Sequence, residues 1–303
     1  MTTHVHGVSA ANRRRLTVVL AITAVVLVVQ VVGAFVSGSL ALLADAGHAL
    51  TDVGGLALAL AASVLAQRPA TALRTWGYRR AEVLSAAAQA AVLLAVGVFV
   101  LVEGVRRLLD PPDVEGDAML AFAAVGLVGN LVGIAVLARA RRDDMNMRAA
   151  FLEVLNDALG SVAVLAAAAA VAWFGWDRAD PVASLLIGAL ILPRTWRLLR
   201  DTVDVLLETT PKGLDLDEVR AHILELPHVR GVHDLHASQV STDMPVLSAH
   251  VVIDDDCFRD GHAPRLLDQL QQCVATHHGV SVAHSTFQLE AAGHGDHEHP
   301  THA

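Results

Sequence analysis

Six long apolar runs constrain what this chain can fold into more than any other feature of its sequence. A helix needs about 20 consecutive apolar residues to cross a bilayer, and runs of that length follow one another up to about residue 200. Each run therefore predicts a transmembrane helix. The expected spans are 16–36, 40–66, 82–109, 116–138, 149–174 and 180–199.

The composition agrees with a multi-pass membrane protein. Of the 303 residues, 54% are hydrophobic and only 17% are charged, which is too apolar for an ordinary soluble domain. Asp, Glu and His residues gather after the last apolar run, so a water-soluble part is expected there. The net charge of −9 argues against a nucleic-acid partner. Cys257 and Cys273 lie in the soluble part, and if that part is cytosolic no disulfide framework is expected.

The arginines predict the orientation in the membrane. They cluster before the first span, between spans two and three, between spans four and five, and after span six. With six spans these clusters all fall on one side, which the positive-inside rule makes cytoplasmic. Arg106 and Arg107, at the outer end of span three, are the exception. Both termini are therefore expected inside.

The soluble part has the pattern of a small α/β domain. Helical periodicity covers 215–226 and 262–277, and alternation covers 229–240, 245–254 and 280–290. The order α-β-β-α-β fits a ferredoxin-like sandwich. The predicted organisation is a cytosolic tail (1–15), a six-helix transmembrane transport domain (16–208), a cytosolic ferredoxin-like domain (209–291) and a disordered, histidine-rich tail (292–303).

Two clusters of ionisable residues lie inside the apolar spans. Asp45, His48 and Asp52 belong to LLADAGHALTD in span two, and Glu153 and Asp157 belong to FLEVLNDALGS in span five. Such residues are costly in a bilayer and mark functional sites. Residues four apart share a helix face, so one imidazole and three carboxylates can surround a small divalent cation. Asp45 is nearer the outer end of its span, and we expect it to support the site.

The charge of this cluster predicts competition between metal and protons. Three carboxylates in a low-dielectric bundle repel one another, so without metal the site is expected to hold one or more protons. An arriving dication would displace them, and protons from outside would displace the metal. That competition makes an antiporter, with Glu153 or His48 as the expected proton carrier.

Three other hypotheses compete with a carrier. Buried polar residues can simply join helices, although five in two helically spaced sets make that a weaker explanation. An intramembrane metalloprotease would need a separate base, and no HExxH motif occurs in the chain, so no enzyme is expected. A membrane-bound metal sensor would have no need of acids buried in the bilayer.

Several motifs along the chain carry a resemblance to a known family. They are SGSLALLADAGHALTD (37–52), GYRRAEVLSA (77–86), VEGVRRLLDPPDV (102–114), NMRAAFLEVLNDALGS (146–161), DPVASLLIGALIL (180–192), VLLETTP (205–211), VHDLH (232–236) and LSAHVVID (247–254). In their order and spacing they resemble the cation diffusion facilitators, and the bacterial zinc and cadmium exporters in particular. The resemblance implies a homodimer in the bacterial plasma (inner) membrane that exchanges a cytosolic divalent metal for protons.

The resemblance also implies which residues bind metal. The family's transport site falls on His48, Asp52, Glu153 and Asp157, but zinc-transporting relatives generally have histidine where Glu153 stands. The extra carboxylate favours Mn²⁺ or Fe²⁺ relative to that pattern, while Zn²⁺ keeps the higher intrinsic affinity. Zn²⁺ is therefore the expected substrate, and a broader or Mn²⁺/Fe²⁺-preferring exporter is the alternative.

Relatives often bind zinc in the cytosolic domain as well, as a structural or regulatory ion. His233, His250 and His284 are the candidate ligands here, followed by His236, Asp254 and Cys257. The histidines of both tails could gather metal near the cytosolic entrance.

Overall fold

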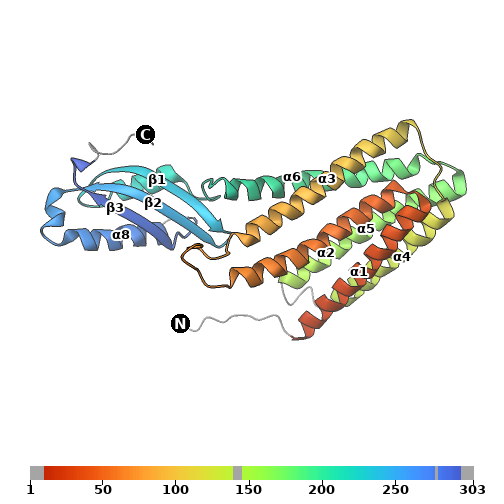
Figure 1. Ribbon diagram of the computed structural model, residues 1–303, viewed down its shortest axis with the longest axis horizontal. Coiled ribbons are helices and arrows are strands. Elements are labelled where there is room, and N and C mark those ends of the chain that lie inside the picture. The colour runs from red at the N-terminus through yellow and green to blue at the C-terminus, as the bar shows by residue number, and fades with distance from the viewer. Residues whose placement is uncertain (1–9, 139–144, 277–278, 295–303) are drawn as a thin grey trace. The chain divides into compact units, whose positions relative to one another are not determined.

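The computed structural model describes residues 10–138, 145–276 and 279–294. The chain divides into two compact units (Figure 1). The first unit runs to Leu60 and resumes over Ala86–Leu199, and the second comprises Ala61–Ser85 and everything from Arg200. The histidine-rich segment 295–303 and His4 and His6 lie outside the described residues.

Six helices of the described chain are long and apolar enough to cross a membrane, as the sequence predicts. The last helix continues well beyond the predicted end at 199, because helical hydrogen bonding persists where the apolar run gives way to a mixed sequence. The helices are α1 (Ala10–Ser37), α2 (Leu40–Ala66), α3 (Ala81–Leu109), α4 (Gly116–Leu137), α5 (Met145–Phe174) and α6 (Ala179–Leu206).

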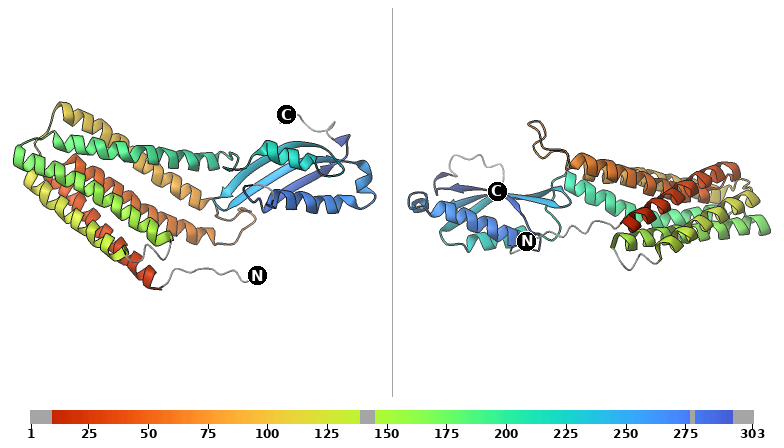
Figure 2. Two further views of the ribbon diagram at one scale, coloured as in Figure 1. Left: turned by 180° about the vertical axis from the view of Figure 1, so that it is seen from behind. Right: turned by 90° about the horizontal axis from the view of Figure 1, so that it is seen from below.

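All six helices contribute to one buried apolar cluster in the first unit. Helices α1, α4 and α5 run side by side (Figures 1 and 2). Small residues let them approach closely: a Cβ added at Gly129 of α4 would lie 2.3 Å from a methyl of Val26 in α1, and one at Gly133 would lie 3.0 Å from a methyl of Val154 in α5. Packing of small against branched side chains therefore holds this part of the bundle.

The start of α2 is capped by a side chain from another helix. The fully buried carboxylate of Asp180, in the first turn of α6, accepts hydrogen bonds from Ser39 Oγ at 2.5 Å, Leu40 N at 2.8 Å and Ala41 N at 3.0 Å. The first N–H groups of a helix have no partner within the helix, and a negative charge there complements the helix dipole. This cap fixes the start of α2 against α6.

The second unit contains a three-stranded sheet with two helices. Strands β1 (Val229–Ser241) and β2 (Met244–Ile253) pair antiparallel, and β3 (His284–Glu290) pairs parallel to β2. Their order with α7 (Leu216–Leu224), the 3₁₀ helix η2 (Asp255–Phe258) and α8 (His262–Thr276) confirms the predicted α-β-β-α-β pattern.

The two faces of this sheet differ in burial. Along β2 every second residue from Leu247 to Ile253 is buried, and these residues form one core with buried residues of α7 and α8. His250 belongs to the alternate set, so it lies on the face away from that core. Val219 of α7 and Leu270 of α8 have no exposed surface. The sheet therefore presents its histidines on the face that the helices do not cover.

Candidate metal centres

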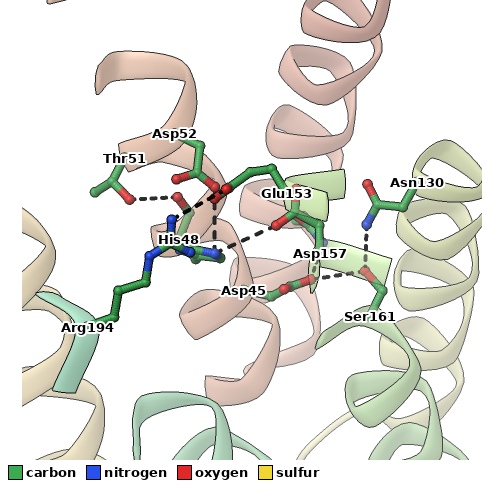
Figure 3. Close-up of polar contacts among 10 residues, drawn as sticks. Asp45, His48, Thr51, Asp52, Asn130, Glu153, Asp157, Ser161 and Arg194 are labelled. Carbon is green, nitrogen blue, oxygen red and sulfur yellow. Dashed lines mark hydrogen bonds and ion pairs between the residues drawn. The ribbon is translucent and has the colours of Figure 1, made fainter. Parts of the chain in front are cut away.

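His48 and Asp52 of α2 meet Asp157 of α5 inside the membrane bundle. Each residue offers one ligand atom, and these atoms all lie within 4.8 Å of one another. His48 Nε2 lies 3.6 Å from Asp52 Oδ2 and 3.7 Å from Asp157 Oδ1 (Figure 3). These two distances are too long for hydrogen bonds. They are close to the roughly 3.3 Å that separates two ligands on a tetrahedral ion with bonds of about 2.0 Å.

Two polar atoms of this cluster are buried without a hydrogen-bond partner. They are His48 Nδ1 and Asp52 Oδ2, in a chain where only five such side-chain atoms are found among the described residues. Buried polar atoms normally find a partner. A divalent cation would supply a partner for Asp52, and the nitrogen and oxygen donors of this cluster suit Zn²⁺.

Glu153 does not join this group in the structure. It lies on α5 one turn before Asp157, but its Oε2 is 3.5 Å from Nη2 of Arg194 on α6 (Figure 3). In the sequence Arg194 stands near the predicted end of span six and counts only among the arginines that set the orientation. No local spacing could have revealed this pair, because 41 residues separate its members.

Asp45 belongs to a polar network beside the ligands. Its carboxylate accepts hydrogen bonds from Gln30 of α1 and from Ser161 of α5, the latter at 3.3 Å, and Asn130 of α4 donates to Ser161 at 3.0 Å. A Cβ added at Gly160 would lie 3.0 Å from Asp45 Oδ1, so the glycine lets α2 come close to α5 at this level. The network connects four helices around the candidate metal ligands.

A second group of ligand atoms lies on the open face of the sheet. His233 of β1 is directly opposite His250 of β2, and Glu290 comes from the end of β3. His250 Nδ1 lies 2.8 Å from Glu290 Oε1, and His233 Nε2 lies 3.0 Å from Glu290 Oε2. The ligand atoms of the three residues lie within 4.8 Å of one another. The sequence missed Glu290, because the register of β3 decides that it faces the histidines.

His284 is not part of that group. It begins β3, six residues before Glu290, and its ring packs edge-on against Trp76 of the α2–α3 loop, with ring centroids 4.9 Å apart. His236 pairs instead with Asp234, with His236 Nε2 3.0 Å from Asp234 Oδ1.

The remaining candidates for cytosolic ligands are engaged elsewhere or buried. The carboxylate of Asp254 accepts hydrogen bonds from the Arg230 guanidinium at 2.5 and 3.1 Å and lies 3.2 Å from His228 Nδ1. These contacts, with Arg230 first, hold the pKa of Asp254 below its ordinary value. Burial raises the pKa of the Cys257 thiol, which disfavours the thiolate form that binds metals.

The spans define a multi-pass membrane protein, and the polar cluster inside them is a candidate cation site. A family model for the cation efflux transmembrane domain matches residues 16–207, and one for the cytoplasmic domain of cation efflux proteins matches residues 211–292. The chain therefore belongs to the cation diffusion facilitator family of cation efflux transporters, and it is a transporter rather than an enzyme.

Characterised relatives cover nearly the whole chain. The metal cation efflux system protein CzcD of Cupriavidus metallidurans is 40% identical over 289 residues, which cover 95% of this chain and 90% of that protein. The zinc transporter ZitB of Escherichia coli is 40% identical, covering 92% of this chain and 88% of that protein. The cadmium, cobalt and zinc/H(+)-K(+) antiporter of Bacillus subtilis is 32% identical, and the match covers 96% of this chain and 93% of that protein.

Proposed function

We propose that this protein is a proton-coupled antiporter that exports divalent metal cations, with Zn²⁺ as its main substrate. The observation that carries the proposal is the cluster of His48, Asp52 and Asp157 inside the membrane bundle. Three relatives with names that include zinc transport or metal cation efflux support the choice of substrate. A histidine with two carboxylates also suits Zn²⁺ chemically.

The mechanism follows from competition at one site. Cytosolic Zn²⁺ binds His48 Nε2 and the two carboxylates after these groups lose their protons, because metal ligands must be deprotonated. When the site opens to the outside, protons return to the same atoms and release the ion. Glu153 or His48 is the proposed proton carrier. A single shared site thus couples metal export to proton entry.

Substrate preference depends on whether Glu153 takes part. With Glu153 as a fourth ligand the site has three carboxylates and becomes harder, which favours Mn²⁺ and Fe²⁺ relative to a site with two histidines. With Glu153 held by Arg194, as in this structure, the three remaining ligands suit Zn²⁺. We therefore place Zn²⁺ first and a broader Mn²⁺/Fe²⁺ range as the alternative.

We further propose a second Zn²⁺ site at His233, His250 and Glu290, with a structural or regulatory role in a homodimer. The three side chains converge on the sheet face that α7 and α8 leave open, where a second subunit could pack. We assign both termini to the cytoplasm of a bacterium with the spans in its inner membrane, and the domain boundaries to 16–208 and 209–291.

Metal uptake into proteoliposomes under an imposed pH gradient tests the transport function. Wild type, Asp157→Ala and Asp117→Ala are compared with Zn²⁺, Cd²⁺, Mn²⁺ and Fe²⁺; Asp117 is an exposed acid in the first turn of α4 and serves as the control. We expect uptake to follow the gradient, to vanish in Asp157→Ala and to persist in Asp117→Ala. Metal that binds but never accumulates would instead support a sensor.

A further inference from the structure

Arg194 brings a positive charge next to the transport cluster. Its guanidinium lies 3.5 Å from the Glu153 carboxylate, which is one helical turn from Asp157 on the same face of α5 (Figure 3). The side chain of Glu153 is 35% exposed and that of Arg194 is 69% exposed. Neither side chain is locked by packing, so this ion pair can open when another cation arrives.

The formal charges explain why a cation belongs beside Glu153. The three carboxylates of Asp52, Glu153 and Asp157 carry −3, and Arg194 reduces the total to −2, which one divalent ion neutralises. Without Arg194 the empty site would carry −3 and would attract a divalent ion more strongly, and the metal-loaded site would keep a charge of −1. Arg194 therefore matches the charge of a site with an extra carboxylate to that of a divalent cargo.

The helix that carries this arginine contains a proline next to it. Pro193 lies inside α6, immediately before Arg194. Proline has no N–H to donate and its ring crowds the preceding turn, so it weakens the helix locally. A weak point in the helix directly before the guanidinium gives Arg194 freedom that a regular helix would not.

We propose that Arg194 is an internal competitor of the metal for Glu153. The guanidinium holds the third carboxylate, that of Glu153, out of the ligand set, which limits the metal affinity of the transport site and eases release of the ion. This inference rests on the proposed transport function. It makes Arg194 a positioning residue that acts through Glu153 and sets how tightly the cargo is held.

A double-mutant cycle tests the competition. Zn²⁺ binding to the full-length purified protein is measured by calorimetry in a His250→Ala background, which removes a ligand of the proposed cytosolic site. The variants are Arg194→Gln, Glu153→Gln and both together. We expect Arg194→Gln to tighten Zn²⁺ binding about tenfold, within the range of measured pairwise couplings. In the Glu153→Gln background the same change should alter the affinity less than about threefold, because no carboxylate remains to be freed.

Two control variants and one transport measurement separate this role from general effects of charge and folding. Arg194→Lys keeps the charge and should bind Zn²⁺ like wild type. Arg197→Gln removes an exposed arginine of the same helix and should change nothing. In transport assays Arg194→Gln should lower both KM and kcat, since the ion binds more tightly and leaves more slowly. A purely structural role would lower the amount of folded protein and leave KM unchanged.

Two results would overturn the inference. One is an equal effect of Arg194→Gln with and without the Glu153 carboxylate, which would make Arg194 a general charge near the site. The other is weaker Zn²⁺ binding in Arg194→Gln. Failure of the transport function itself has a different signature: Asp157→Ala would bind and move Zn²⁺ like wild type.

Discussion

Asp180 is the buried carboxylate on which the start of α2 depends most. It accepts hydrogen bonds from one hydroxyl and two backbone N–H groups of another helix. Asp180→Ala leaves these donors buried without partners, at a cost of about 1–3 kcal/mol each. We expect a clear loss of thermal stability in detergent, measured by size-exclusion chromatography after heating. Asp117→Ala, which removes an exposed acid, should melt like wild type; an equal loss in both variants would contradict the assignment.

The stability of the second unit is expected to depend on pH through Asp254. Hydrogen bonds from Arg230 and then His228 lower the pKa of this carboxyl, so its contribution to stability is fully present above the ordinary value of about 3.9 and is lost as the pH falls through the lower folded value. Arg230→Ala should therefore weaken hydrogen-exchange protection of β1 and β2 at pH 6, and the difference from wild type should shrink below pH 4.

The control for Asp254 is a more exposed pair of the same type. Arg259 Nη2 lies 2.9 Å from Asp256 Oδ1, and both side chains are mostly exposed. Exposed ion pairs contribute little to stability, so Arg259→Ala should leave protection of the strands unchanged. A difference between Arg230→Ala and wild type that persisted undiminished at pH 3 would contradict the role given to Asp254.

Residues of the candidate transport site were predictable where spacing along one helix places them on one face. His48 and Asp52 are four apart in an apolar helix, and the sequence identified both together with Asp157. The partner of Glu153 lies 41 residues away on another helix, and only the tertiary arrangement of the helices determines that contact. Glu290 was missed for a related reason, since only the register of β3 on β2 directs it towards His250.

Among the helices, α4 and α5 make the closest backbone approach around a glycine. A Cβ added at Gly116, the first residue of α4, would lie 2.7 Å from Cα and 2.8 Å from N of Ala172 in α5. Gly116→Ala must therefore push the two helices apart, and we expect a lower melting temperature in detergent. Backbone atoms cannot move aside as a flexible side chain can. The stability lost through this clash should therefore exceed the roughly 0.5–1 kcal/mol that alanine gains over glycine in a helix.

Gly54 of α2 provides the matched control. No atom lies within 4 Å of a Cβ added there, so Gly54→Ala should keep or slightly raise the melting temperature through its better helix propensity. If the Gly116→Ala variant were as stable as the Gly54→Ala variant, that result would contradict the close contact between α4 and α5.

Whole elements were easier to predict from the sequence than their ends. The six spans and the α-β-β-α-β order follow from hydropathy and periodicity, which the chain displays locally. The start of α5 and the end of α6 depend on hydrogen bonds that continue past the apolar runs, as the extension of α6 to Leu206 shows. Which residues of different strands share a sheet face could not be predicted, because this depends on the register between strands. Alternation within one strand does not give that register.

At the scale of the whole molecule, the two candidate metal centres lie in different units and share no residue. Each should therefore be removable without loss of the other. We expect wild type to retain about two equivalents of Zn²⁺ per subunit after desalting, and His250→Ala and Asp157→Ala about one each. Elemental analysis of the purified full-length protein measures these values.

Transport then distinguishes the roles of the two centres. Export should persist in His250→Ala, because His48, Asp52 and Asp157 remain, and should be lost in Asp157→Ala although the cytosolic ion is retained. His233→Ala should reproduce His250→Ala, since the two rings face each other across β1 and β2 with centroids 5.1 Å apart. If either cytosolic variant lost both ions, the two centres would not be independent, and the transport site would require metal on the sheet in order to fold.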